Sequence, residues 1–244
     1  MPLLSAESIT VRFGGIAALH EADVTVDAGG VTGLIGPNGA GKTTLFNVIS
    51  GLQAPTHGRV VLDGTDITGA SPFRRARMGI ARTFQKLEAF GSLSAHDNVL
   101  VAAEQRRAWS RDRIDPRAVA DDLLERCGIS DVARFMVGTL PTGTARRVEL
   151  ARALATEPRV LLLDEPSSGL NEDETEAMAA LLGDFAADGL GVLLVEHDMS
   201  FVMGACEHIH VLDFGTVIAT GPPSEIQGDP AVQVAYLGSA AVDG

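Results

Sequence analysis

The stretch Gly36–Thr44 reads GPNGAGKTT and lies between the apolar runs VTGLI and LFNVI. It fits the phosphate-binding pattern G-x-x-x-x-G-K-[ST], in which Gly36, Gly41, Lys42 and Thr43 occupy the fixed positions. Glycines allow successive backbone N–H groups to point inward at phosphate oxygens. The lysine adds a positive charge beside the β- and γ-phosphates, the threonine hydroxyl suits Mg²⁺, and the following helix directs its positive end at the same anion. The pattern predicts a nucleoside triphosphate site. The residues expected to bind phosphate are Gly36, Asn38, Gly39, Ala40, Gly41, Lys42, Thr43 and Thr44.

A second signal is RVLLLDEP, at residues 159–166. Its continuous apolar run is typical of a strand buried on both faces, and it delivers Asp164 to the edge of the sheet where ligands bind in open α/β folds. Asp164 is placed to hold Mg²⁺, directly or through water. Glu165 follows at once and is placed to polarise an attacking water. After a phosphate loop, the two carboxylates favour hydrolysis of the terminal phosphate over an ordinary strand end.

The elements that must position these residues alternate between strands and helices. Apolar and β-branched runs predict strands at Ser8–Phe13, Ala22–Val26, Val31–Ile35, Arg59–Leu62, Val160–Leu163 and Gly191–Val195, and a hairpin of Ile209–Leu212 with Thr216–Ala219. Helices are expected after a cap at Asp97-Asn98, after Asp115-Pro116, over Ala145–Thr156 and over Glu172–Ala187. This order predicts an α/β core interrupted by a helical insertion.

Composition narrows the possible functions. The 244 residues include 19 Lys and Arg against 32 Asp and Glu, for a net charge of −13, which argues against a nucleic-acid partner. The two cysteines, Cys127 and Cys206, have no metal-binding spacing. No apolar run approaches the ~18 residues needed to span a bilayer, and the N-terminus is unlike a secretory signal. We therefore expect any connection to a membrane to come through a partner.

Further motifs follow in the order found in ATP-binding-cassette (ABC) ATPases, and the chain resembles that family over nearly its whole length. Gln85 in RTFQ resembles the Q-loop glutamine, which contacts Mg²⁺ and the attacking water and senses a transmembrane partner. His197 in VEHDM resembles the switch histidine that contacts the γ-phosphate. Phe13, 23 residues before Gly36, resembles the aromatic residue that stacks on adenine. SSGLN, at residues 167–171, resembles the D-loop at a dimer interface.

The resemblance implies a fold and a set of cofactors. It implies one ABC ATPase domain over residues 1–244, with a P-loop NTPase core at 1–90 and 145–244 that carries an N-terminal antiparallel β subdomain. A helical subdomain is inserted at about residues 91–144. ATP and Mg²⁺ are the implied cofactors, with Mg²⁺ held by Thr43, Gln85 and Asp164.

The finer resemblance is to ATPases of branched-chain amino acid importers. The matching text is RFGGIAAL, MGIARTFQ, GLNEDET, VEHDM and the ending AYLG. ATPases of lipopolysaccharide export share much of this text and are an alternative. Cargo is chosen by the permease, so the resemblance leaves other amino acids, amides and lipids open.

One motif departs from the family pattern. The ABC signature is normally LSGGQ, or LSYGQ and LAYGQ in this branch, and the matching text here is LPTGT at residues 140–144. In the family this loop crosses a head-to-tail dimer and binds the γ-phosphate held by the other chain. Pro141 offers neither a hydroxyl nor a backbone N–H, whereas Thr142 retains a hydroxyl and Gly143 allows close backbone approach. Either the site works with these donors, or the subunit hydrolyses slowly and relies on a partner.

The implied mechanism is ATP hydrolysis coupled to transport. Glu165, His197 and Gln85 are the expected catalytic residues, and the chain pairs with an identical or a second ABC ATPase. The dimer drives separate transmembrane permease subunits at the cytoplasmic face of the membrane, with an extracytoplasmic solute-binding protein involved indirectly. Two alternatives are an ATP-binding regulatory subunit that hydrolyses weakly and a soluble ABC protein of translation or DNA repair. The latter usually carries two cassettes or a long coiled coil, and this chain has neither.

Overall fold

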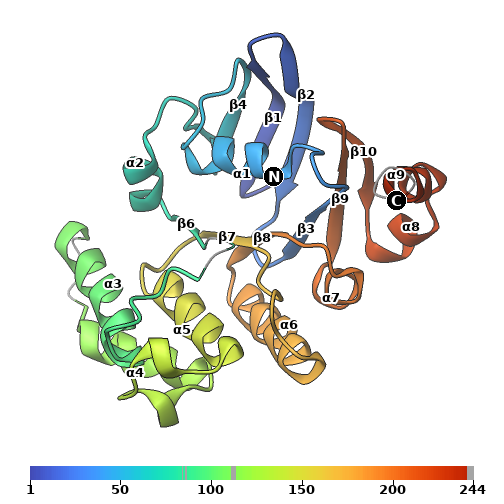
Figure 1. Cartoon of the computed structure of the whole chain (residues 1–244). Helices are drawn as coiled ribbons and strands as arrows, with labels where there is room; N and C mark the ends of the chain where they lie inside the picture. The colour runs from blue at the N-terminus through green and yellow to red at the C-terminus, as the bar shows by residue number, and fades with distance from the viewer. Residues whose placement is uncertain (84, 86, 111–113, 241–244) are drawn as a thin grey trace.

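The computed structural model describes residues 1–83, 85, 87–110 and 114–240, which form two β-sheets and the helices packed against them (Figure 1). One sheet is antiparallel, with the strand order β2-β1-β4-β5. Its strands are β1 (Leu4–Phe13), β2 (Ile16–Val26), β4 (His57–Leu62) and β5 (Thr65–Asp66). This is the N-terminal antiparallel sheet that the sequence predicts.

The second sheet has the strand order β10-β9-β3-β8-β7-β6 and is parallel from β9 to β6. Its strands are β3 (Val31–Ile35), β6 (Ile80–Arg82), β7 (Val160–Asp164), β8 (Gly191–Val195), β9 (His208–Asp213) and β10 (Thr216–Gly221). The predicted hairpin is present, because β10 pairs antiparallel with β9. Strands β3 and β8 are buried along their whole length, which explains their continuous apolar sequences. The α/β class is confirmed.

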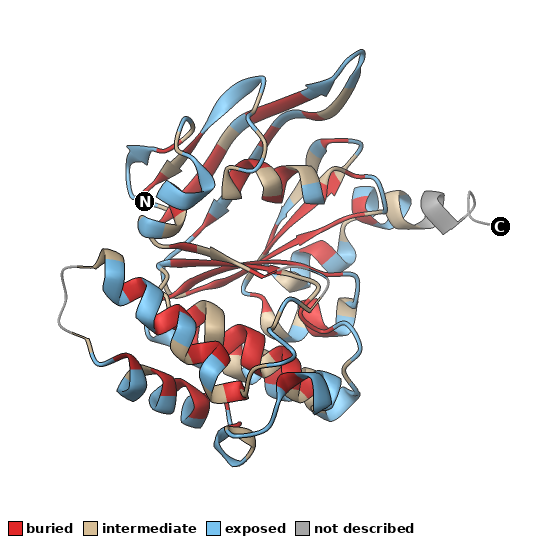
Figure 2. Cartoon of the chain, turned by 60° about the vertical axis from the view of Figure 1, so that its left-hand side comes forward, coloured by how far each residue is buried: buried red, intermediate tan, exposed pale blue. Residues whose placement is uncertain are grey.

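Two hydrophobic cores lie on the two faces of the parallel sheet. Helix α1 (Lys42–Ser50) lies between the two sheets, where Leu45, Phe46 and Ile49 are fully buried. The core on the opposite face is built by α3 (Ala95–Trp109), α4 (Pro116–Arg126), α5 (Thr142–Leu154), α6 (Glu172–Ala187) and α7 (Met199–Ala205). Figure 2 shows the buried stripes of these helices turned toward one another and toward the sheet. In the described residues no helix is long and apolar enough to cross a bilayer.

Shorter elements connect the larger ones. Helix α2 (Pro72–Arg77) precedes β6, and α8 (Pro223–Gly228) and α9 (Pro230–Ala240) follow β10. Two 3-10 turns, Ser130–Val132 and Val137–Thr139, lie between α4 and α5.

Two predicted helix starts are wrong. Helix α3 begins at Ala95, capped by Ser94, whose Oγ accepts from the backbone N–H of Asp97 at 3.0 Å. Asn98 is instead buried inside the helix, and its amide exchanges hydrogen bonds with the backbone of Phe90. Helix α5 begins at residue 142 rather than 145. The boundary at 144 therefore falls inside a helix, and the division into core and helical subdomains stays a prediction.

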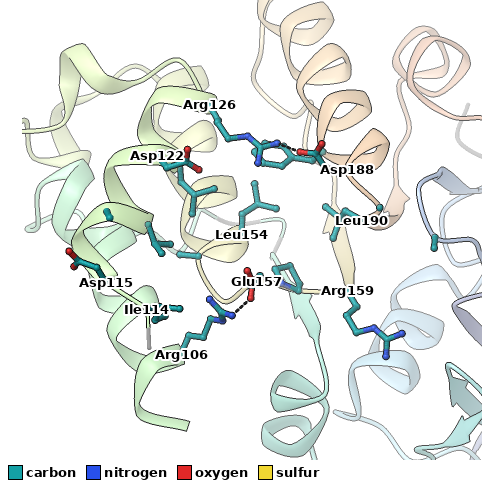
Figure 3. Close-up of a pocket in the computed structure, with 18 of the residues that line it drawn as sticks. Arg106, Ile114, Asp115, Asp122, Arg126, Leu154, Glu157, Arg159, Asp188 and Leu190 are labelled. Carbon is teal, nitrogen blue, oxygen red and sulfur yellow. Dashed lines mark hydrogen bonds and ion pairs between the residues drawn. The ribbon is translucent and has the colours of Figure 1, made fainter. Parts of the chain in front are cut away.

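A cavity of about 930 Å³ lies between α4, the end of α5 and the start of β7 (Figure 3). Two ion pairs join its walls. Arg126 of α4 lies 2.5 Å from Asp188 at the end of α6, and Arg106 of α3 pairs with Glu157 in the loop before β7. These pairs fasten α3 and α4 to the part of the chain that carries the sheets. The lining residues include none of those predicted to bind nucleotide.

Candidate nucleotide-binding site

The phosphate loop connects β3 to α1. Gly36, Gly39 and Gly41 adopt φ values of +148°, +79° and +109°, in the region that favours glycine. Helix α1 begins at Lys42 with no side-chain cap and no acidic residue in its first turn. The first N–H groups of the helix and its positive end therefore face the loop, as an anion site requires.

The loop is enclosed by backbone from both sheets. A methyl group on Gly36 would lie 1.9 Å from the carbonyl oxygen of Leu212 in β9. A methyl group on Gly41 would lie 2.7 Å from the carbonyl oxygen of Ala18 in β2. These glycines are required by the packing of the loop as well as by its turns.

Lys42 points back into the loop. Its ammonium donates to the carbonyl oxygens of Gly36 at 2.6 Å and Pro37 at 2.9 Å, and the residue is 6% exposed. Burial lowers the pKa of Lys42, while the nearby carboxylates of Glu165 and Asp164 oppose that shift. The side chain thus holds a positive charge inside the curve of the loop.

Asp164 lies at the end of β7 in a largely buried ion pair. Its Oδ2 lies 3.2 Å from Nη2 of Arg82 on β6, and the two side chains are 13% and 9% exposed. Nη1 of Arg82 donates to Asn47 at 2.7 Å and to Ser50 at 3.1 Å, and the guanidinium lies over the ring of Phe46. Arg82 therefore ties the end of β7 to the helix that follows the phosphate loop.

Glu165 meets the two other predicted catalytic residues. Its Oε2 accepts from Nε2 of Gln85 at 2.7 Å, and its Oε1 lies 2.9 Å from Nε2 of His197. The three residues follow β6, β7 and β8, which are neighbours in the sheet. Glu165 has a φ of +51°, a strained value for a residue other than glycine. The structure thus joins three side chains that are far apart in the sequence.

Glu196 organises the loops on either side of this cluster, and its role is not predicted from the sequence. The residue is 3% exposed. Its carboxylate accepts from the backbone N–H groups of Ser167 at 2.7 Å and His197 at 2.9 Å. The buried carboxylate of Glu196 therefore fixes the backbone in two places, after Glu165 and at His197. The only signal in the sequence is an acidic residue directly after a buried strand.

The loop that carries Gln85 is anchored on α5. Nη2 of Arg146 donates to the carbonyl of Gln85 at 2.8 Å, and Nη1 of Arg152 donates to the carbonyl of Glu88 at 2.8 Å. The backbone N–H of Glu88 donates to Glu149 at 3.1 Å. Burial raises the pKa of Glu149. Any movement of this loop must therefore be accommodated by α5.

The LPTGT segment lies at the start of α5, against α6 of the same chain. Pro141 occupies the position before the helix and provides no side-chain cap. Thr142 packs beside Gly169, because a methyl group added to Gly169 would lie 3.3 Å from Cγ2 of Thr142. Gly143 is buried, and a methyl group there would lie 2.3 Å from Oε1 of Glu174. The space at Gly143 is thus filled by a carboxylate.

Among the remaining predicted site residues, Ala40 is 3% exposed and therefore buried, whereas others are accessible from solvent. Phe13 is 53% exposed at the end of β1, and Asn38 and Thr43 are exposed. Burial raises the pKa of Tyr236 in α9, and a hydrogen bond with the backbone of Gly36 opposes the rise. The stacking role of Phe13 and the phosphate contacts stay predictions.

Comparisons with known proteins identify the class. The family described as "ABC transporter" matches residues 19–168, and that described as "Branched-chain amino acid ATP-binding cassette transporter" matches residues 216–242. The chain therefore belongs to the ABC transporter ATP-binding proteins, and it is an ATPase subunit of an ABC transporter.

Individual relatives agree with this class. The branched-chain amino acid transport ATP-binding protein BraF of Pseudomonas aeruginosa is 39% identical, with 98% of this chain and 99% of BraF covered. The lipopolysaccharide export ATP-binding protein LptB of Haemophilus influenzae is 34% identical, with 98% of each chain covered. The ADP conformation of the cassette MJ1267 superposes with a TM-score of 0.87 at 29% identity, covering 98% of this chain and 99% of MJ1267. A dimeric cassette, MJ0796 bound to ADP and Pi, gives a TM-score of 0.78 at 26% identity, covering 90% and 98%.

Replacement of Gly36 by alanine tests the packing of the loop. The new methyl group would collide with the backbone of β9 at a positive φ, so we expect the free energy of unfolding to fall by about 3 kcal/mol. Gly39 is the matched control, because it also has a positive φ but nothing within 4 Å. Gly39→Ala should cost only about 1 kcal/mol in urea unfolding. Equal losses would contradict the close contact.

Replacement of Arg82 by glutamine tests the buried ion pair. Removing the guanidinium leaves the Asp164 carboxylate without its cation, so the free energy of unfolding should fall by about 3 kcal/mol. Arg159→Gln is the control, because its pair with Asp63 is 48% and 67% exposed and should contribute less than about 1 kcal/mol. Chemical denaturation of both variants measures the difference. An Arg82 variant as stable as the control would show that the pair has no such role.

Proposed function

We propose that the chain binds ATP and Mg²⁺ between the phosphate loop and the end of β7 and hydrolyses the terminal phosphate. The observation that carries this proposal is the meeting of Glu165, Gln85 and His197 at the ends of three neighbouring strands. Glu165 takes a proton from the attacking water. The oxygen of that water bonds to the γ-phosphorus, and the bond between the γ-phosphorus and the bridging oxygen of the β-phosphate breaks. Gln85 orients that water, and His197 stabilises charge on the γ-phosphate.

The residues proposed to hold Mg²⁺ fit that metal by their chemistry. Thr43, Gln85 and Asp164 offer a hydroxyl, an amide and a carboxylate, and Mg²⁺ prefers oxygen ligands. No group of three His, Cys, Asp or Glu side chains in the described residues could hold a metal alone. The proposed ligands include a single carboxylate, which suits Mg²⁺ because this cation commonly binds together with substrate phosphates. When bound, the metal neutralises charge on those phosphates.

Glu165 must exchange partners before it can act. Both of its oxygens are engaged, one by Gln85 and one by His197. His197 has a side chain 45% exposed, so it can turn toward a γ-phosphate and release one oxygen for water. Nucleotide binding and preparation of the base are therefore the same event.

The proposed assembly is a dimer of this chain with itself or with a second ABC ATPase. Each chain would close over the ATP of the other, presenting Thr142 and Gly143 to the γ-phosphate. Support comes from the dimeric form of the cassette MJ0796. The departure of LPTGT from the usual signature keeps a weakly hydrolysing partner subunit as the second candidate.

The proposed cargo is a branched-chain or related amino acid, carried by separate permease subunits in the membrane. Support comes from BraF and from the match of residues 216–242 to the importer family. The chain would act at the cytoplasmic face of the membrane, with a solute-binding protein acting on the other side. The likeness to LptB makes lipid export the alternative.

A groove beside the Gln85 loop suits the permease. It has a volume of about 460 Å³ and lies among α2, α3 and α5. Its apolar side chains Leu52, Phe73, Phe90 and Val101 are 43–58% exposed. Exposed aromatic and aliphatic side chains at a concave surface are typical of protein interfaces. A permease segment in this groove would contact the loop that carries Gln85.

Glu165→Gln tests the assignment of the catalytic base. The amide keeps the shape of the side chain but cannot accept the proton of water, so steady-state ATP hydrolysis should fall at least ~100-fold. The variant should also accumulate as an ATP-bound dimer in size-exclusion chromatography. Undiminished phosphate release would overturn the assignment. A wild-type chain inactive even with its permeases would favour the regulatory subunit.

Phe73→Asp tests the docking groove. A carboxylate in place of an apolar ring at the interface must lose its water when the permease binds, so recovery of permease from detergent-solubilised membranes should fall at least ~10-fold. ATP hydrolysis by the isolated chain should stay within about twofold of wild type. Phe135→Asp is the matched control, since Phe135 is equally exposed at 57% but lies outside the groove. Equal recovery with both variants would exclude this surface, and identification of the recovered permease tests the cargo.

A further inference from the structure

An acidic side chain of α6 lies against the start of α5, where the proposed dimer needs an anion site. Gly143 is the second residue of α5 and is buried within a single chain. What covers it is Glu174, whose Oε1 lies 2.3 Å from the position of a Gly143 methyl group. The carboxylate therefore lies against the first turn of α5. In the proposed dimer, this turn would face the γ-phosphate bound by the other chain.

The position of Glu174 is fixed by its own helix. Glu174 and Asn171 form a reciprocal capping box at the start of α6. Oε2 of Glu174 accepts from the backbone N–H of Asn171 at 3.1 Å, and the backbone N–H of Glu174 donates to Asn171 at 2.9 Å. Because Oε2 is held in this way, Oε1 is directed across to Gly143. The capping box of α6 therefore determines the contact between Glu174 and α5.

Electrostatics favours the carboxylate at this place. Helix α5 has no side-chain cap and no acidic residue in its own first turn. Glu174 supplies a negative charge from another helix, and negative charge near a helix N-terminus is stabilising. The carboxylate thus places negative charge beside the first turn of α5, where the proposed dimer would bring a phosphate.

We propose that Glu174 is an electrostatic brake on the ATP-driven dimer. The proposal rests on the dimer described under the proposed function. The γ-phosphate of the facing chain must approach the start of α5 against the charge of Glu174, or displace it. The brake favours the open arrangement and shortens the time for which two chains stay closed. It gives Glu174, one of the three acidic residues in the GLNEDET segment, a role beyond its capping box.

Glu174→Gln separates charge from structure. Glutamine also closes a capping box at this helix position and has nearly the same volume, so the fold and the packing on Gly143 are kept. Glu172→Gln is the matched control. It removes the same charge from the same turn, but Glu172 is exposed, whereas Glu174 lies against Gly143.

The experiment measures dimerisation in a Glu165→Gln background, where hydrolysis does not interfere. Analytical ultracentrifugation with saturating ATP and Mg²⁺ gives the dimer Kd for each variant. Removing one like charge at short range should lower the Kd about fivefold for Glu174→Gln at low salt. Glu172→Gln should change it less than about twofold. At about 1 M salt, where charges are screened within about 3 Å, the advantage of Glu174→Gln should largely disappear.

The outcomes are distinct. A Kd that is unchanged or higher in Glu174→Gln, or a gain that persists at high salt, would overturn the brake and leave the dimer intact. A Kd lowered equally by Glu172→Gln would also overturn it, because the effect would then be one of net charge. If no variant dimerises with ATP, the proposed dimer itself fails, and the brake fails with it.

Discussion

The structure depends on close backbone contact at the phosphate loop. Gly36 lies against Leu212 of the parallel sheet, and Gly41 lies against Ala18 of the antiparallel sheet. The backbone N–H of residue 215 also donates to the carbonyl of residue 40 at 2.8 Å. A loop without side chains at these points lets the two sheets meet around α1. The shape of the anion site and the joint between the sheets are therefore one feature, and a change in the first disturbs the second.

The acidic residues at the strand ends differ in how they are held. Asp164 is paired with the buried Arg82, and Glu196 accepts from backbone N–H groups. Glu165 is different, because both of its partners are side chains on loops, Gln85 and His197, and both partners are exposed. Fixed backbone donors and enclosed guanidinium groups cannot withdraw, whereas exposed side chains can. Of these three acids, Glu165 is the one whose surroundings can change, as the proposed role of catalytic base requires.

Local patterns predicted the elements, and long-range contacts decided the details. The glycine spacing of Gly36–Thr44 and the apolar strand before Asp164 carry their chemistry in consecutive residues, so they were recognisable from the sequence. Glu196 could not be found in this way, because it acts on Ser167, 29 residues away, through backbone groups that have no sequence signature. The predicted start of α3 differs from the observed one for a related reason. Asn98 looks like a cap, but a tertiary contact with Phe90 buries it inside the helix.

Helix α5 connects two parts of the proposed cycle. Arg146 and, in its last turn, Arg152 hold the loop that carries Gln85, and its first turn carries Gly143. Because hydrogen bonds run along the whole helix, it moves as one body over this length. In the proposed assembly, a permease that shifts the Gln85 loop would therefore also shift Gly143 relative to α6, where Glu174 lies against it. Contact with the membrane partner and access of a facing phosphate to α5 are in this way linked by a single helix.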